Sequence, residues 1–123
     1  MSTPLVFKFG GASVKDAQSV RNVACIIGQF SQRPMVVVVS AMGKMTNAFE
    51  EVVAAWSNGN LSEANAKIDA IAAFHQGIIN ELFEDPTEIN EHVAALIASI
   101  REGLDNQTFL TAKATTTLCT TEN

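Results

Sequence analysis

Lys8-Phe9-Gly10-Gly11-Ala12-Ser13-Val14 joins a short apolar run, residues 5–7, to the start of a helical pattern. Strand, glycine turn and helix in this order is an arrangement that binds phosphate, because amide groups of the turn and the helix end face the anion. Two adjacent glycines allow positive φ and let a ligand approach without meeting a β-carbon. Lys8 at the end of the strand would add a positive charge. The bare pattern also fits an ordinary turn beside a solvated lysine.

The residues that follow predict a helix and then a buried strand. From Asp16 to Phe30, apolar residues recur every three or four positions, which is typical of a helix with one apolar face. Met35–Val39 is a continuous apolar run without alternation, so we expect both faces of this strand to be buried in a parallel sheet. Residues 1–47 therefore predict a βαβ unit.

A second loop, residues 40–47, follows that strand directly. In open α/β sheets ligands bind beyond the carboxyl ends of the strands, so we expect both loops to face one site. Thr46 can in addition cap the next helix, which is compatible with a role in binding. Gly43-Lys44 also matches the end of a Walker A motif, but Val38 and Met45 stand where that motif needs glycine and Ser or Thr.

For residues 48–104 the sequence predicts helices joined by short turns. A first helix carries a stripe that includes Phe49, Val52, Val53 and Trp56. Ser62–Phe83 and Thr87–Leu104 are amphipathic and are separated by Glu84-Asp85-Pro86, which predicts an antiparallel helical hairpin.

Two histidines fall within this helical part, and the pattern ends after it. We interpret His75, on the apolar face of its helix, as a packed and hydrogen-bonded residue, and we expect His92 to be exposed. Residues 105–123 lack an apolar stripe and are rich in threonine, so they predict a short strand or an irregular tail.

The composition restricts the class of protein. A chain of 123 residues with 47% hydrophobic and 17% charged residues predicts one globular domain. No apolar run is long enough for a membrane span and no signal-type segment precedes the first strand, which predicts a cytoplasmic protein without a membrane partner. Cys25 and Cys119 are too isolated for a disulfide framework or a metal site, so we expect free thiols and no protein-held metal.

Charge is distributed unevenly along the chain. Residues 1–45 hold five basic side chains against Asp16 alone, a net charge of +4, whereas the remainder holds three against twelve acids, a net charge of −9. A basic segment beside glycine turns suits a phosphate ligand, and the acidic remainder argues against nucleic acid as a partner. The acidic helices are interpreted as water-facing.

Two motifs together resemble the aspartate kinases of the amino-acid kinase family. Residues 8–14 resemble the K-F-G-G-T-S-V opening of those enzymes, with Ala12 in place of threonine, and residues 37–47 resemble their V-V-V-S-A-x-x-x-x-T-N stretch. The resemblance covers residues 4 to about 104. It implies a three-layer αβα sandwich with a mostly parallel sheet, here incomplete, in which residues 48–104 are a helical hairpin insertion.

The same resemblance implies an activity, ligands and site residues. Aspartate kinases transfer the γ-phosphoryl group of ATP to the β-carboxylate of L-aspartate, in the biosynthesis of lysine, threonine and methionine, with Mg²⁺ held through the phosphates. Lys8 would be catalytic, stabilising charge on the transferred group. ATP would be bound by Lys8, Gly10, Gly11, Ser13 and Ser40, and aspartate by Ser40, Ala41 and Thr46. A homo-oligomer is expected of the full-length protein.

One motif of that family is missing, which leaves other functions open. The family carries a V-x-x-G-E segment after the helical insertion, and its glutamate binds aspartate, so we expect this N-terminal fragment to be inactive alone. The alternatives are another phosphotransferase of the family and a non-enzymatic α/β interaction module; ATP binding separates the module from both kinases. We also hypothesise a reading-frame shift, since the codons of residues 116–123 read one base earlier can encode Asp-His-Phe-Val-His-Tyr-Gly-Glu.

Overall fold

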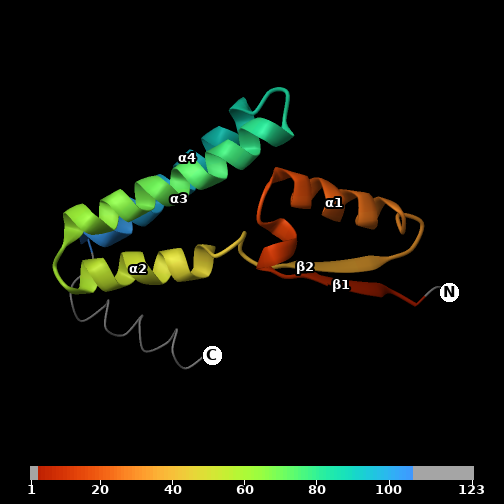
Figure 1. The fold of residues 1–123 in the computed structure, drawn as a ribbon, viewed down its shortest axis with the longest axis horizontal. Coiled ribbons are helices and arrows are strands. Elements are labelled where there is room, and N and C mark those ends of the chain that lie inside the picture. Colours follow the sequence, from red (N-terminus) through yellow and green to blue (C-terminus); the bar gives the residue numbers. More distant parts are fainter. Residues whose placement is uncertain (1–2, 107–123) are drawn as a thin grey trace.

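The computed structural model describes residues 3–106 (Figure 1). Its elements follow in the order β1 (Leu5–Phe9), the 3₁₀ helix η1 (Gly11–Val14), α1 (Ala17–Gly28), β2 (Met35–Val39), α2 (Met45–Ser57), α3 (Leu61–Leu82) and α4 (Thr87–Asn106). The predicted strands, helices and helical hairpin are confirmed, with shifts of one or two residues at the helix ends. Residues 105 and 106, predicted to lie in the tail, continue α4, and the rest of the predicted tail, with its frame-shift hypothesis, lies outside the described residues.

The two strands form a parallel pair with α1 on one face. Leu5 pairs with Met35 and the register runs to Phe9 opposite Val39. α1 buries its apolar stripe against the sheet, in a cluster of Phe9, Val14 and Val23. Figure 1 shows α1 along one side of the strands and no described element along the other. The mixed α/β class is therefore confirmed, since residues 3–106 form a two-stranded parallel sheet with four α-helices.

The prediction that β2 is buried on both faces is wrong for these residues. Val36 and Val38 are 53% and 48% exposed, and Val6, beside them on β1, is 70% exposed. Side chains alternate across a strand, so these three valines share the face opposite α1. Because α1 covers one face and no described element covers the other, the continuous apolar run of β2 remains half open.

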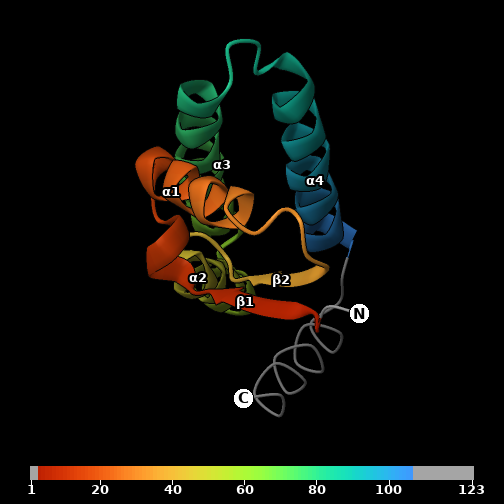
Figure 2. The same ribbon diagram turned by 90° about the vertical axis from the view of Figure 1, so that its right-hand side faces the viewer.

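Helices α2, α3 and α4 build a second layer with its own core. Val52 and Ala55 of α2 meet Ala64, Ile68 and Ile71 of α3 in one buried cluster. The indole Nε1–H of Trp56 donates to the carbonyl oxygen of Leu104 at 2.8 Å, which ties α2 to the end of α4. Figure 2 shows α3 and α4 as the two arms of the hairpin, joined by the loop at its top.

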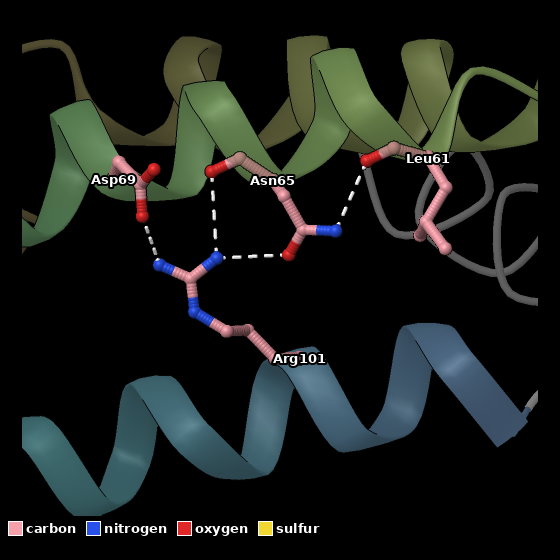
Figure 3. A network of polar contacts seen from close by, with 4 residues as sticks. All are labelled: Leu61, Asn65, Asp69 and Arg101. Atoms are coloured by element: carbon pink, nitrogen blue, oxygen red, sulfur yellow. Dashed lines mark hydrogen bonds and ion pairs between the residues drawn. The ribbon is translucent and has the colours of Figure 1, made fainter.

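A polar network also joins the two arms of the hairpin. The guanidinium of Arg101 on α4 donates to the side-chain oxygen of Asn65 at 2.8 Å and pairs with Asp69, both on α3 (Figure 3). Asn65 in turn donates to the carbonyl oxygen of Leu61 at 3.0 Å. The network fixes the register of α4 on α3, although α4 has no fully buried residue.

The histidines and the first cysteine lie where the sequence predicts. His75 is half-buried and its Nδ1 lies 2.8 Å from the carbonyl oxygen of Ile71, whereas His92 is exposed. Cys25 is an exposed free thiol, and Cys119 lies outside the described residues. No helix within residues 3–106 is long and apolar enough to cross a membrane.

Candidate functional site

The two candidate loops meet at one end of the sheet. Because β1 and β2 are parallel, both loops leave from the carboxyl ends of the strands. The amide of Ser40 donates to the carbonyl oxygen of Phe9 at 2.9 Å, and the amide of Gly43 donates to that of Gly11 at 3.0 Å. Ladder pairing therefore continues beyond both strands, and the convergence that the topology predicts is present.

The first loop has a different conformation from the expected one. Gly10 has φ −76°, and residues 11–14 form a 3₁₀ helix in which the amide of Ser13 donates to the carbonyl oxygen of Gly10 at 3.0 Å. Within residues 3–106, positive φ occurs only at Gly43 and Gly59. Gly10 and Gly11 therefore do not use the positive φ that glycine allows. Gly11 is needed instead for a close approach, since a β-carbon there would lie 2.5 Å from the carbonyl oxygen of Gly43.

The amino terminus of α1 is already capped. Asp16 is the N-cap residue, and its Oδ1 accepts from the amide of Ser19 at 2.7 Å. Hydrogen bonding to the backbone of Ser19, and less strongly to its side chain, lowers the pKa of Asp16 below its ordinary value. The carboxylate of Asp16 thus satisfies the amide of Ser19, one of the donors in the first turn of this helix. The 3₁₀ turn leaves the amides of Gly11 and Ala12 without an acceptor inside its own helix.

Lys8 lies on the sheet face opposite α1. Phe7 and Phe9 pack towards α1, so the alternation of β1 directs Lys8 to the other face, beside Val38 in the register. Its side chain is exposed, and among the residues that the structure describes no carboxylate pairs with it. The ammonium group is therefore a charge at the end of β1 that an anion can approach.

The second loop contains a residue with positive φ, Gly43, at +54°. The chain then enters α2, whose N-cap position is Lys44 without a side-chain hydrogen bond. Thr46 lies inside the first turn of α2 and is exposed, so the prediction that it caps this helix is wrong. Its hydroxyl is left free of that structural role at the start of the helix. Ser40 and Ala41 are exposed in the same loop.

A pocket of about 500 Å³ opens between the first loop and α1. Its polar lining comes from Ser13, Lys15, Asp16, Gln18, Ser19 and Asn22, above a floor that includes Phe9 and Val23. Of the predicted site residues, Ser13 lines this pocket, whereas Lys8, Ser40 and Thr46 do not. The structure thus brings the two loops together through their backbones without gathering all the predicted side chains in one cavity.

Two contacts with the site come from residues that the sequence did not single out. A β-carbon added to Gly43 would lie 3.5 Å from Cζ of Phe74, in the middle of α3, and 3.9 Å from Cα of Lys15. Arg21 of α1 donates to the carbonyl oxygen of Glu81 at 2.7 Å, which ties α1 to the end of α3. Helix α3 therefore packs against α1 and lies beside the second loop at Gly43. No local signal in the sequence indicates either contact.

A comparison with protein families matches residues 3–118 to the amino acid kinase family. Among curated proteins, the chain is 37% identical over 95 residues to aspartokinase 1, chloroplastic, of Arabidopsis thaliana, which covers 74% of this chain and 16% of that protein. It is 35% identical over 95 residues to aspartokinase 2, chloroplastic, of the same plant, which covers 74% of this chain and 17% of that protein.

A bacterial relative extends the match. The chain is 34% identical over 120 residues to the aspartokinase of Chlamydia trachomatis serovar D, covering 85% of this chain and 26% of that protein. The chain spans about a sixth to a quarter of the length of these relatives. The resemblance that the two motifs indicate is confirmed by these similarities.

Proposed function

The chain belongs to the amino acid kinase family, and on that premise we propose that it supplies the ATP loop and the aspartate loop of an aspartate kinase. The reaction would be transfer of the γ-phosphoryl group of ATP to the β-carboxylate of L-aspartate. The observation that carries the proposal is the hydrogen-bonded meeting of the two loops at the carboxyl ends of β1 and β2. The three aspartokinase relatives support the choice of acid.

The chemistry requires positive charge and amide donors rather than a covalent intermediate. A carboxylate attacking a phosphoryl group brings two anions together, so catalysis depends on positioning and on charge stabilisation. Lys8 would stabilise charge on the transferred group, and the turn of Gly10, Gly11 and Ser13 would hold the phosphates. Lys8 has no carboxylate partner among the described residues, so its charge is available to the transferred group.

Residues of the second loop would hold the acceptor acid. Ser40 would lie between the two substrates, with Ala41 and Thr46 on the aspartate side. The exposed hydroxyl of Thr46, free of a capping bond, supports this assignment. The γ-phosphoryl group would then pass from ATP at the first loop to a β-carboxylate oxygen of aspartate at the second, with ADP as the leaving group.

Magnesium would reach this site bound to the phosphates of ATP and would offset their charge. Residues 3–106 hold no group of three or more His, Cys, Asp and Glu side chains that could hold a metal ion. Asp16, the acidic residue nearest in sequence to the first loop, already accepts the amide of Ser19. We propose that the metal arrives with its nucleotide.

The open face of the sheet supports the layered architecture of a complete kinase domain. Val6, Val36 and Val38 form an apolar strip there, with Lys8 at its carboxyl end. We propose that further elements of the longer protein cover this strip and complete a three-layer αβα sandwich. Assembly of that protein as a homo-oligomer and its cytoplasmic location stay predictions.

Calorimetric titration with Mg–ATP tests the proposal. We expect the chain to bind Mg–ATP, and Lys8→Ala to weaken that binding about tenfold, because a charge-assisted contact is lost. Lys67→Ala is the matched control, since Lys67 pairs with Glu51 in the helical layer at 3.5 Å, away from the loops. Equal losses in both variants, or no binding by the unaltered chain, would contradict the assignment.

A further inference from the structure

The hydrogen-bond ladder between the strands does not stop at their ends. After the Ser40 amide on Phe9, the Gly43 amide donates to Gly11 at 3.0 Å, although both loops have by then left the sheet. The two loops are therefore held at two successive points. A change in the path of one loop must break the outer of these bonds or move the other loop with it.

No side chain separates the loops at the outer point. A β-carbon on Gly11 would lie 2.5 Å from the carbonyl oxygen of Gly43 and 3.2 Å from that of Ala41. These are backbone atoms, which cannot turn aside as a flexible side chain can. At Gly10 the same addition meets no atom within 4 Å, and its φ of −76° suits any residue. The two neighbouring glycines thus have different roles.

Gly43 is enclosed from the other side. Its φ of +54° is a conformation that side chains disfavour, and an added β-carbon there would lie 3.5 Å from Cζ of Phe74. Phe74 is half-buried on α3, a helix fixed by Ile68, Ile71 and the Arg21 contact at its end. The second loop therefore lies between the first loop and Phe74 of α3.

We propose that the contact of Gly11 with Gly43 makes the two loops one mechanical unit, and that Phe74 is a positioning residue that supports it. Nucleotide bound at the first loop would then make the second loop more ordered before aspartate binds. This inference rests on the function proposed above. Because the loops share a backbone contact, ordering one reduces the cost of ordering the other, which couples the two ligands positively.

Amide hydrogen exchange of the free chain tests the contact without any ligand. We expect Gly11→Ala to speed the exchange of the Gly43 amide about tenfold, because the bond to Gly11 is lost. Gly10→Ala, the matched control, should leave that rate unchanged. Phe74→Leu should also speed it, whereas Phe83→Leu, at an exposed residue of the hairpin, should not. If neither Gly11→Ala nor Phe74→Leu changes the exchange rate of the Gly43 amide more than its control does, the two loops are not one mechanical unit.

Exchange measured with saturating Mg–ATP tests the coupling. We expect slower exchange at Gly11 and Ala12 and, in the same sample, at Gly43; Gly11→Ala should confine the effect to the first loop. Protection of the first loop alone in the unaltered chain would overturn the coupling while leaving the proposed function intact. Protection at neither loop would overturn both the proposed function and the coupling. The exchange rates of the ligand-free variants would still decide whether the two loops are in contact.

Discussion

Ile68→Ala should destabilise the helical layer strongly. Ile68 is 0% exposed and lies in the cluster that joins α2 to α3. The substitution removes three carbon atoms, which at about 0.8 kcal/mol each amounts to about 2.4 kcal/mol of transfer free energy. The cavity left behind adds to this, so the free energy of unfolding should fall by about 3 kcal/mol.

Urea denaturation followed by the fluorescence of Trp56 measures this loss, because Trp56 packs against the same cluster. With a slope of about 2 kcal/mol per molar urea, the midpoint should fall by about 1.5 M. Leu96→Ala is the control: Leu96 is 65% exposed on α4, and its midpoint should move by less than about 0.3 M. Equal shifts in the two variants would refute the assignment of this core.

Four further substitutions have expected outcomes. Gly77→Ala, inside α3 with no atom within 4 Å of an added β-carbon, should raise the free energy of unfolding by about 0.5–1 kcal/mol in the same assay. The pKa of Asp16 is lowered by its bond from Ser19, so its contribution to stability is full above the ordinary value of 3.8 and is lost as pH falls through the lower folded pKa. Asp16→Asn should therefore flatten the acid limb of a stability–pH profile below about pH 4. In a hybrid that carries residues 3–104 within the Chlamydia trachomatis aspartokinase, Lys8→Ala should lower kcat more than about tenfold, whereas Thr46→Ala should mainly raise the KM for aspartate; the reverse pattern would contradict the assigned roles.

Much of the fold follows from local pattern. The apolar runs at residues 5–9 and 35–39 and the helical stripes indicate the elements, because burial of one face imposes their period on the sequence. The meeting of the two loops follows as well, since parallel strands send both carboxyl ends to the same edge. The N-cap role of Asp16 could also be predicted, because its carboxylate follows a turn and precedes the apolar stripe of α1.

Other features depend on distances that no local pattern contains. The sequence shows two neighbouring glycines, but only the tertiary structure shows that Gly11 touches the second loop while Gly10 faces open space. The exposure of Val36 and Val38 depends on which elements cover the second face of the sheet, and the composition of β2 cannot indicate this. Phe74 belongs to an ordinary helical pattern, and its approach to Gly43 depends on how α3 packs in the tertiary structure.

The direct test of the central claim is an amide chemical-shift titration of the chain with Mg–ATP. We predict the largest changes at Gly10, Gly11 and Ser13, and weaker ones at Ser40 and Gly43 through the bonds between the loops. The exposed hairpin, sampled at Leu96, should stay unchanged. Saturable changes confined to α3 and α4, or none at the first loop, would contradict the claim that the carboxyl ends of β1 and β2 form a nucleotide site.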